Sequence, residues 1–264
     1  MCDPVTHAPL EVRGGVLLSP SASYELREGI PVFAPEPEKL NRKYQKMYDR
    51  LAPVYDFAES AYQWVTKRDI RGFLAEEFEV KPFMRVLEVS IGTGANLRLL
   101  PADAEMHGLD LSLGMLRACR RNLRRQHRDA TLYQGEAERL PFRDDSFDLV
   151  FHVGGINFFS DRAKAIAEMI RVAKPGSKIL IADETEEHVQ AMYESGPVTG
   201  SYYKNRKEPV KAPVDLVPPE MLETHLELLK PMGKNRFYVL TFRKPGVGGE
   251  PVKSGTVEAS VIGA

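Results

Sequence analysis

The stretch Val86-Leu87-Glu88-Val89-Ser90-Ile91-Gly92-Thr93-Gly94 decides the fold class of this chain. It joins an apolar run typical of a buried strand, residues 85–89, to a glycine-containing turn. Glycine lets a ligand approach the backbone closely, and a helix starting after the turn would offer free N–H groups. Alone, the two glycines are weak evidence for any particular ligand. A dinucleotide-binding turn needs a small residue at position 97, which is leucine here, and Glu88 disfavours a ligand with two phosphates.

Strand-like and helix-like segments alternate after this turn. Further strand-like runs cover residues 104–110, 131–134, 147–153 and 178–182, and helical periodicity covers 113–126 and 163–173. This alternation indicates right-handed crossovers and a parallel sheet covered on both faces. We therefore predict an α/β protein with a doubly wound, mostly parallel sheet, and we expect a helix at 220–229 and a last strand at 237–242.

The flanking segments differ from this domain, which we place at residues 79–244. Residues 1–40 combine short apolar runs with many turn formers and predict a small β appendage. Residues 41–78 have helical periodicity. An insertion at 186–218 is rich in proline and glycine, and residues 245–264 have few large apolar groups, so we expect that tail to be disordered.

The composition excludes several classes of protein. Of 264 residues, 43% are hydrophobic and 28% charged, which is ordinary for a globular domain. Two cysteines exclude a disulfide scaffold and a four-cysteine zinc site. The net charge of −1 gives no global attraction for nucleic acid, so we expect none as a partner. We expect neither a membrane span nor a signal peptide, and therefore a cytoplasmic protein.

Three acidic residues, Glu88, Asp110 and Glu136, stand at the ends of successive strands. The carboxyl ends of strands in a doubly wound sheet line one crevice, so these residues should face one ligand. Because carboxylates only accept hydrogen bonds, Asp110 suits two ribose hydroxyls, Glu136 an exocyclic amine and Glu88 an ammonium group. A ligand with an amine, a ribose and an adenine but no phosphate matches this set, and S-adenosylmethionine (SAM) is the obvious candidate.

The order of these motifs resembles that of class I SAM-dependent methyltransferases. Besides residues 86–94, the matching motifs are Gly108-Leu109-Asp110-Leu111-Ser112, Gly135-Glu136-Ala137-Glu138-Arg139-Leu140-Pro141-Phe142 and Glu168-Met169-Ile170-Arg171-Val172-Ala173-Lys174-Pro175-Gly176. Together with residues 48–56, the set is similar to the ubiquinone/menaquinone-biosynthesis-like (methyltransferase type 11) family, over about residues 44–183. The resemblance implies a seven-stranded Rossmann-like sheet, with residues 41–78 as a helical lid and 186–218 as the acceptor cap.

The resemblance also implies roles for individual residues. Cofactor contacts are expected from Tyr48, Tyr55, Glu88, Ser90, Gly92, Gly94, Asp110, Leu111, Met115, Glu136, Ala137 and His152. Within this set, Gly92 and Gly94 border the methionine moiety, Asp110 holds the ribose, and Glu136 with the backbone of Ala137 reads the adenine. Two departures are Ser90, which replaces the first glycine of the motif, and Glu136, which stands where aspartate is usual.

The acceptor side of the site is less defined by sequence. His152 and Asp183 are candidate catalytic residues, although either could equally serve the core or be solvated. Asn157 and Phe158 follow the fourth strand, and Tyr202 and Tyr203 lie in the insertion, so we expect these four to contact substrate. The expected reaction is methyl transfer by in-line displacement to a small, partly apolar or aromatic acceptor that is quinone-, phenol- or lipid-like.

Two alternatives stay open at this stage. An RNA or protein methyltransferase would be favoured if the arginine-rich helix near residues 117–128 faced the active site. A non-catalytic SAM-binding module could act through the appendage, which resembles a degenerate zinc ribbon that retains only Cys2 and His7 as ligand types. Zinc normally needs four ligands, so we predict no metal. Oligomerisation through the appendage and peripheral membrane contact are also left open.

Overall fold

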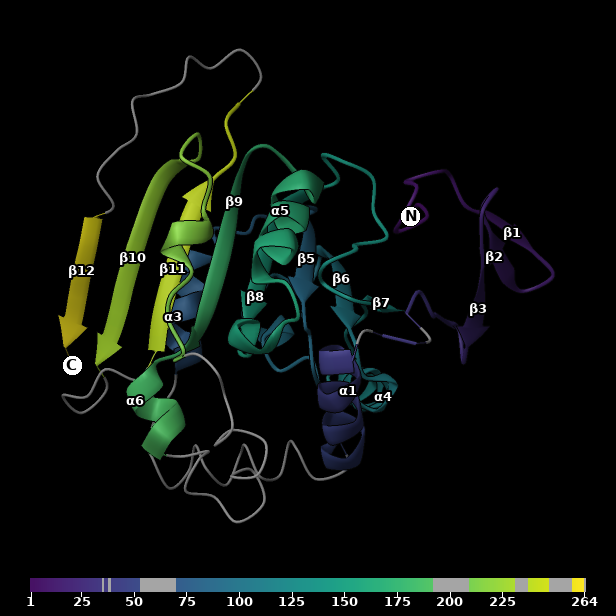
Figure 1. Ribbon diagram of the computed structural model, residues 1–264, viewed down its shortest axis with the longest axis horizontal. Coiled ribbons are helices and arrows are strands. Elements are labelled where there is room, and N and C mark those ends of the chain that lie inside the picture. The colour runs from purple at the N-terminus through teal and green to yellow at the C-terminus, as the bar shows by residue number, and fades with distance from the viewer. Residues whose placement is uncertain are drawn as a thin grey trace.

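A large twisted sheet runs through the protein (Figure 1). The computed structural model describes residues 1–34, 36–37, 39–52, 70–191, 209–230, 237–246 and 258–263. The strand order is β12-β10-β11-β9-β8-β5-β6-β7. These strands are β5 (Arg85–Val89), β6 (Glu105–Asp110), β7 (Thr131–Gln134), β8 (Phe147–Val153), β9 (Ala173–Glu184), β10 (Leu222–Lys230), β11 (Phe237–Arg243) and β12 (Glu258–Gly263).

The pairing of the strands confirms the predicted fold class. Strands β7, β6, β5, β8 and β9 pair in parallel, whereas β11 is antiparallel to both β9 and β10. The seven strands β5 to β11 form the expected mostly parallel sheet, and β12 adds an eighth at its edge. All five strands predicted between residues 85 and 182 are present.

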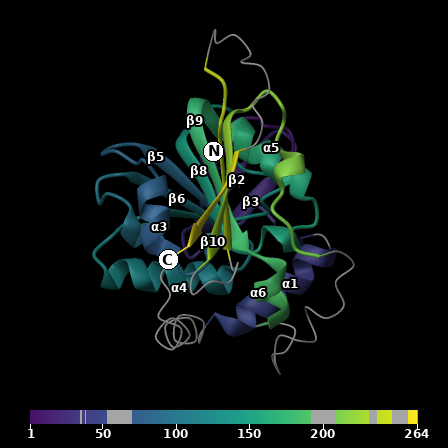
Figure 2. The ribbon, with the colours of Figure 1, turned by 90° about the vertical axis from the view of Figure 1, so that its left-hand side faces the viewer.

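Helices cover both faces of the sheet (Figure 2). On one face, α5 (Arg162–Val172) buries Ala165, Ile166 and Met169 in the same cluster as Leu87 and Val89 of β5. The other face packs against helices α3 (Ile70–Glu77) and α4 (Leu113–Arg125), in a cluster that also takes Val86. Alternate residues of β5 therefore face opposite sides, as the pleat of a strand requires.

The helix predicted at residues 220–229 is wrong, because this segment is strand β10. Leu226 and Leu228 pack on one face of the sheet, and Leu229 packs on the other. A strand buried on both faces has no polar–apolar alternation, so its leucines imitate the spacing of a helix.

Two further expectations differ from the structure. Residues 258–263, placed in a disordered tail, form β12 and pair in parallel with β10, whose open edge offers unpaired backbone groups. The helix expected directly after the glycine turn is only a short 3-10 turn, Leu97–Leu99. Pro101, two residues after this turn, disfavours its continuation as a helix.

The N-terminal residues form the predicted small β appendage. Strands β1 (Glu11–Arg13), β2 (Val16–Leu18), β3 (Ser23–Arg27) and β4 (Ile30–Pro31) make an antiparallel sheet. Directly after β4, Val32 bridges to Gln134 of β7, and the Gln134 side chain bonds both backbone groups of Ala34 at 3.1 and 2.9 Å. The appendage is thus attached to the β7 edge of the large sheet.

One buried carboxylate organises this appendage. Asp3 is 1% exposed, and its Oδ2 accepts hydrogen bonds from Ser19, Ser21 and Tyr24 at 2.5, 3.2 and 3.0 Å. Its Oδ1 accepts the N–H groups of Val5 and Thr6, both at 2.9 Å. Burial favours the neutral acid, but these bonds outweigh it and hold the pKa of Asp3 well below its ordinary value.

The segment expected to be a helical lid begins with helix α1 (Lys39–Leu51), which lies against α4. Asp49 Oδ1 accepts from Ser112 Oγ at 2.5 Å and from Gly114 N at 2.9 Å, at the N-terminus of α4. A carboxylate there satisfies N–H groups that have no partner within the helix. Residues 53–69 lie outside the described part of the chain. No helix among the described residues is long and apolar enough to cross a membrane.

Candidate functional site

The candidate site lies at the carboxyl edge of the parallel strands. Val89 at the end of β5 is in register with Leu109 of β6 and with His152 of β8. Asp110 at the end of β6 is in register with Gln134 of β7. The strand ends that carry the predicted residues therefore meet along one edge, as expected for a doubly wound sheet.

The glycine turn after β5 has an unusual backbone. Ser90, Gly92 and Gly94 all have positive φ, at 61°, 56° and 77°. Ser90 therefore adopts the left-handed conformation for which glycine is the usual residue. A Cβ on Gly92 would meet open space, whereas one on Gly94 would lie 2.7 Å from Cys119 Sγ. Gly94 thus allows α4 to pack closely, and Gly92 leaves the turn accessible.

Asp110 connects this turn to the end of β6. The residue is 8% exposed; its Oδ2 accepts from Gly92 N and its Oδ1 from Ser112 N, both at 2.8 Å. Burial raises the pKa of Asp110 to about 6, although the N–H groups of Ser112 and Gly92 oppose the shift. Both oxygens keep further acceptor capacity, since an ionised carboxylate has about four lone-pair sites.

The other two predicted carboxylates are also buried and have amide partners. Glu88 is 1% exposed, and its Oε1 accepts from Asn96 Nδ2 at 2.7 Å. Glu136 is 8% exposed, and its Oε1 accepts from Asn41 Nδ2 of α1 at 2.9 Å. All three acids therefore lie inside the protein at strand ends, and neither Glu88 nor Glu136 is a solvated surface charge.

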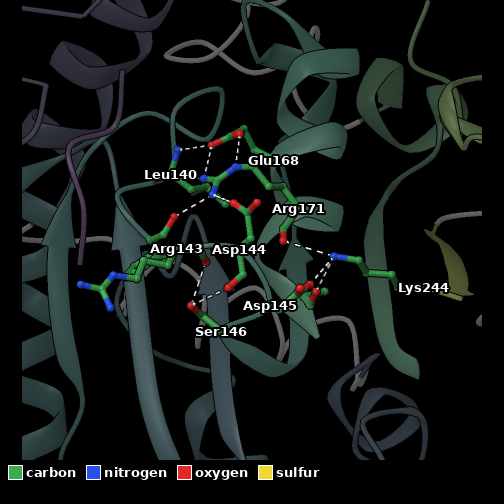
Figure 3. Close-up of polar contacts among 10 residues, drawn as sticks. Leu140, Arg143, Asp144, Asp145, Ser146, Glu168, Arg171 and Lys244 are labelled. Carbon is green, nitrogen blue, oxygen red and sulfur yellow. Dashed lines mark hydrogen bonds and ion pairs between the residues drawn. The ribbon is translucent and has the colours of Figure 1, made fainter. Parts of the chain in front are cut away.

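The loop after β7, which carries Glu136, is fixed by a charged cluster (Figure 3). Glu168 of α5 accepts from Leu140 N at 2.7 Å and pairs with Arg171 at 2.6 Å. Arg171 in turn donates to Leu140 O at 3.0 Å, to Phe142 O at 2.8 Å and to the Asp144 carboxylate at 2.7 Å. The motif Glu168-x-x-Arg171 thus clamps the loop that follows Glu136.

His152 is fully buried near the end of β8. Its Nδ1 lies 2.9 Å from the carbonyl oxygen of Val89, which can only accept, so Nδ1 carries the proton. Its Nε2 has no hydrogen-bond partner in the described part of the chain. Burial lowers the pKa of His152, against the opposing charge of Asp183, so the ring is neutral at pH 7. Phe159 contacts its edge, with ring centroids 5.1 Å apart.

Asp183 and Asn157 form a second polar group at the end of β9. Asp183 is 3% exposed and accepts from Gly155 N at 2.9 Å and from Asn157 Nδ2 at 3.2 Å. Asn157 Nδ2 also lies 3.2 Å from Tyr238 Oη, and Asn157 Oδ1 accepts from Arg162 at 2.9 Å. This network joins β9, β11 and the turn after β8.

The remaining predicted residues fall into three groups. Met115 and Ala137 are buried at 2% and 6% exposure, and Leu111 O accepts from Gln45 of α1 at 3.1 Å. Tyr48 is half-buried in α1, and Phe158 packs against Tyr44, with ring centroids 5.3 Å apart. The last group, Tyr55, Tyr202 and Tyr203, lies outside the described residues.

Sequence reasoning missed the amide partners of the carboxylates, Asn41 and Asn96. Asn96 lies two residues after the quoted glycine turn and eight residues after Glu88, so its proximity to Glu88 could be expected from the sequence. Asn41 lies 95 residues from Glu136 along the chain, and no local pattern connects the two. Asn41 is buried in an otherwise charged helix segment, and this burial depends on tertiary packing rather than on the local sequence.

Comparison with known proteins identifies this part of the chain. The sequence model of the family described as "Methyltransferase domain" matches residues 87–181. This part of the chain is therefore similar to that family of methyltransferases. The matched range contains Glu88, Asp110, Glu136 and His152, and it ends within β9.

Two curated relatives extend the comparison. The chain is 36% identical over 138 residues to demethylmenaquinone methyltransferase of Renibacterium salmoninarum, covering 52% of this chain and 56% of the relative. It is 33% identical over 152 residues to the ubiquinone/menaquinone biosynthesis C-methyltransferase UbiE of Geotalea daltonii, covering 53% and 63%. The chain therefore spans less than two thirds of the length of either relative.

A solved structure supports the fold. Phosphoethanolamine N-methyltransferase 2 of Haemonchus contortus, in complex with S-adenosyl-L-methionine, has a TM-score of 0.57 and 18% identity. The similarity covers 76% of this chain and 60% of that one, and at this identity it concerns the fold alone.

The chemistry of the described residues fits SAM. Asp110 has acceptor capacity for hydroxyl groups, and Gly92 leaves open space beside the turn. Glu136 already binds one amide N–H donor, the same kind of group that an exocyclic amine presents.

Proposed function

We propose that this protein is a SAM-dependent methyltransferase that acts on a quinone-like aromatic acceptor. The observation that carries the proposal is the buried Asp110 carboxylate, held by the N–H groups of Gly92 and Ser112 within the methyltransferase domain. A desolvated carboxylate with a raised pKa is costly unless a ligand provides donors for it. A ribose diol is such a ligand.

Three residues at the strand ends would bind the cofactor. Asp110 would accept the two ribose hydroxyls, Gly92 would leave room beside the methionine portion, and Glu136 would accept from the adenine amine. When bound, SAM supplies an electrophilic methyl group on a sulfonium. Helix α1 reaches Glu136 through Asn41 and the start of α4 through Asp49, so it would cover the bound nucleoside and exclude water.

His152 would serve as the proton acceptor for the methyl acceptor. Its Nδ1–H is held by Val89 O, so the neutral ring presents the lone pair of Nε2. Deprotonation of a ring hydroxyl raises the electron density at the neighbouring ring carbon, and this favours attack on a methyl electrophile. The negative charge of Asp183 would stabilise the imidazolium that results.

The aromatic character of the acceptor rests on two supports. The relatives bear the names demethylmenaquinone methyltransferase and ubiquinone/menaquinone biosynthesis C-methyltransferase. In this chain, Phe159 lies against the edge of His152, and Phe158 packs beside Tyr44 of α1. Apolar rings next to a buried base suit an aromatic acceptor.

The proposal is tested by two measurements on the full chain. Calorimetry should detect SAM binding, and radiolabelled SAM should transfer its methyl to a short-chain demethylmenaquinol but not to the same quinol already methylated on the ring. Binding without transfer to any quinol or phenol would favour a non-catalytic SAM-binding module. Transfer to RNA or protein alone would contradict the acceptor class.

A further inference from the structure

Charge is distributed very unevenly in this protein. Helices α1 and α4 together contain ten Lys and Arg residues and one acidic residue, Asp49, a formal charge of +9. The whole chain carries −1, so the rest of the chain carries −10. A nearly neutral protein therefore contains one strongly basic pair of helices.

Besides Arg117, seven basic residues of the two helices are exposed. Helix α4 buries Met115, Leu116, Ala118, Cys119 and Leu123. Helix α1 buries Asn41, Tyr44 and Met47. We define the α1–α4 surface by the exposed cations of the two helices, which are Arg42, Lys43, Lys46, Arg50, Arg121, Arg124 and Arg125.

Most of this charge is not neutralised within the protein. Arg117 and Arg120 of α4 both pair with Glu28 of the appendage, and those two arginines are outside the defined surface. Within the part of the chain that the structure describes, no ion pair is present at five of its cations: Lys46, Arg50, Arg121, Arg124 and Arg125. Unneutralised cations on amphipathic helices indicate an anionic partner.

The surface borders the candidate site. Helices α1 and α4 lie along the same edge of the molecule, at the end where β5 and β6 finish (Figure 1), and Figure 2 shows both along that edge from the side. Asn41 of α1 binds Glu136, and Asp49 binds the first residues of α4. A partner bound at this surface would therefore lie next to the carboxyl edge of the sheet.

We propose that the α1–α4 surface docks on the headgroups of an anionic membrane, so that a bilayer-dissolved acceptor reaches the site directly. This inference rests on the proposed quinone-like acceptor, since such lipids are dissolved in bilayers. Cations on one face are attracted to acidic lipids within a Debye length of about 8–10 Å. Leu40, in the first turn of α1, is 42% exposed and adds an apolar side chain beside them.

A planar membrane fits the charge distribution better than a nucleic acid does. A membrane touches only one face, so acidic side chains on the other faces of the described structure stay away from the headgroups. A flexible or wrapping polyanion would meet that negative surface around the edges of the patch. Binding to a nucleic acid is therefore an outcome that the experiment must distinguish.

The test is co-sedimentation of the full chain with vesicles. One set contains phosphatidylcholine alone, the other phosphatidylcholine with about one third phosphatidylglycerol, a composition with strong anionic surface potential. The variant is R121E/R124E. The matched control is K81E/R143E, because Lys81 and Arg143 are exposed, precede β5 and β8, and so lie at the opposite end of the sheet.

Wild type should bind the anionic vesicles at least tenfold more tightly than the neutral ones, and roughly 0.3 M salt should abolish the preference. R121E/R124E should lose at least tenfold in affinity, and K81E/R143E should stay within about twofold. Equal binding to both vesicle types, equal loss in both variants, or binding to single-stranded RNA without vesicle binding would overturn the proposal.

A thermal shift with SAM separates this result from the proposed function. R121E/R124E should retain the shift of wild type, since neither arginine contacts the three acids in the described structure. If wild type binds anionic vesicles but shows no shift with SAM, the proposed function fails while the docking surface stands.

Discussion

The raised pKa of Asp110 predicts that SAM affinity depends on pH. With a pKa of about 6, the carboxylate of the free protein is about 90% ionised at pH 7 and about 10% at pH 5. The ionised carboxylate can accept a hydrogen bond from each ribose hydroxyl, whereas the protonated form carries a hydrogen on one oxygen and must lose it to do the same. We therefore expect the dissociation constant for SAM to rise about tenfold from pH 7 to pH 5.

The same carboxylate weakens the free fold at neutral pH. Its pKa rises from 3.8 to about 6, and two units correspond to about 3 kcal/mol. The folded pKa lies above the unfolded one, so the protonated Asp110 side chain stabilises the fold below pH 4. This stabilisation is lost as the pH rises through 6. Donors from a bound ribose would offset part of the cost, so SAM should raise the Tm more at pH 7.5 than at pH 5.5.

The variant Asp110→Asn separates the carboxylate from other titrating groups, including those of SAM itself. Two charge-assisted hydrogen bonds are lost, so binding at pH 7.5 should weaken by about 3 kcal/mol, or roughly 100-fold. The pH slope below 7 should disappear as well. Asp129→Asn, which removes an exposed carboxylate, should bind like wild type. Isothermal calorimetry at five pH values measures both effects, and a flat profile in wild type, or an unchanged slope in Asp110→Asn, would refute the reasoning.

Three other expectations follow from the described contacts. His152→Gln should lower kcat for a quinol at least 100-fold and remove the acidic limb of the pH–rate profile. The affinity for SAM should stay within about threefold of wild type. An unchanged pH–rate profile would contradict the role of His152 as the proton acceptor. Arg171→Ala leaves the buried Glu168 carboxylate without its cation and should lower the free energy of unfolding in urea by about 3 kcal/mol. The exposed Arg98→Ala should lower it by less than about 0.5 kcal/mol. Equal effects of the two variants would contradict a stabilising role of the Glu168–Arg171 pair. Asp3 has a lowered pKa, so the ionised carboxylate stabilises the fold above pH 4, and this stabilisation is lost below it. Amide hydrogen exchange in residues 1–34 should therefore accelerate below pH 4 in wild type but not in Asp3→Asn. The same pH dependence in both proteins would contradict this.

The position of the acids was predictable because it depends on strand order alone. Glu88 and Asp110 lie at the ends of β5 and β6, and Glu136 follows β7; parallel strands bring their carboxyl ends to one edge. Sequence could not reveal how each acid is held. The backbone donors at Asp110 depend on the left-handed turn at Ser90 and Gly92, and the partner of Glu136 comes from a helix almost one hundred residues away.

The errors in predicted elements also have physical causes. The sequence of β10 imitates a helix because its leucines pack against both faces of the sheet, where strand alternation is lost. β12 has no strong sequence signal of its own and forms by adding to the exposed edge of β10. In both, tertiary contacts rather than local preference determine the structure.

The most direct test is a crystal structure of the protein with S-adenosylhomocysteine, the demethylated product of SAM. The account predicts both ribose hydroxyls within about 3 Å of the Asp110 carboxylate oxygens, with the adenine amine beside Glu136 and the sulfur on the side of Gly92. A ligand bound elsewhere, or bound here with its ribose turned away from Asp110, would contradict the assignment of this edge as the cofactor site.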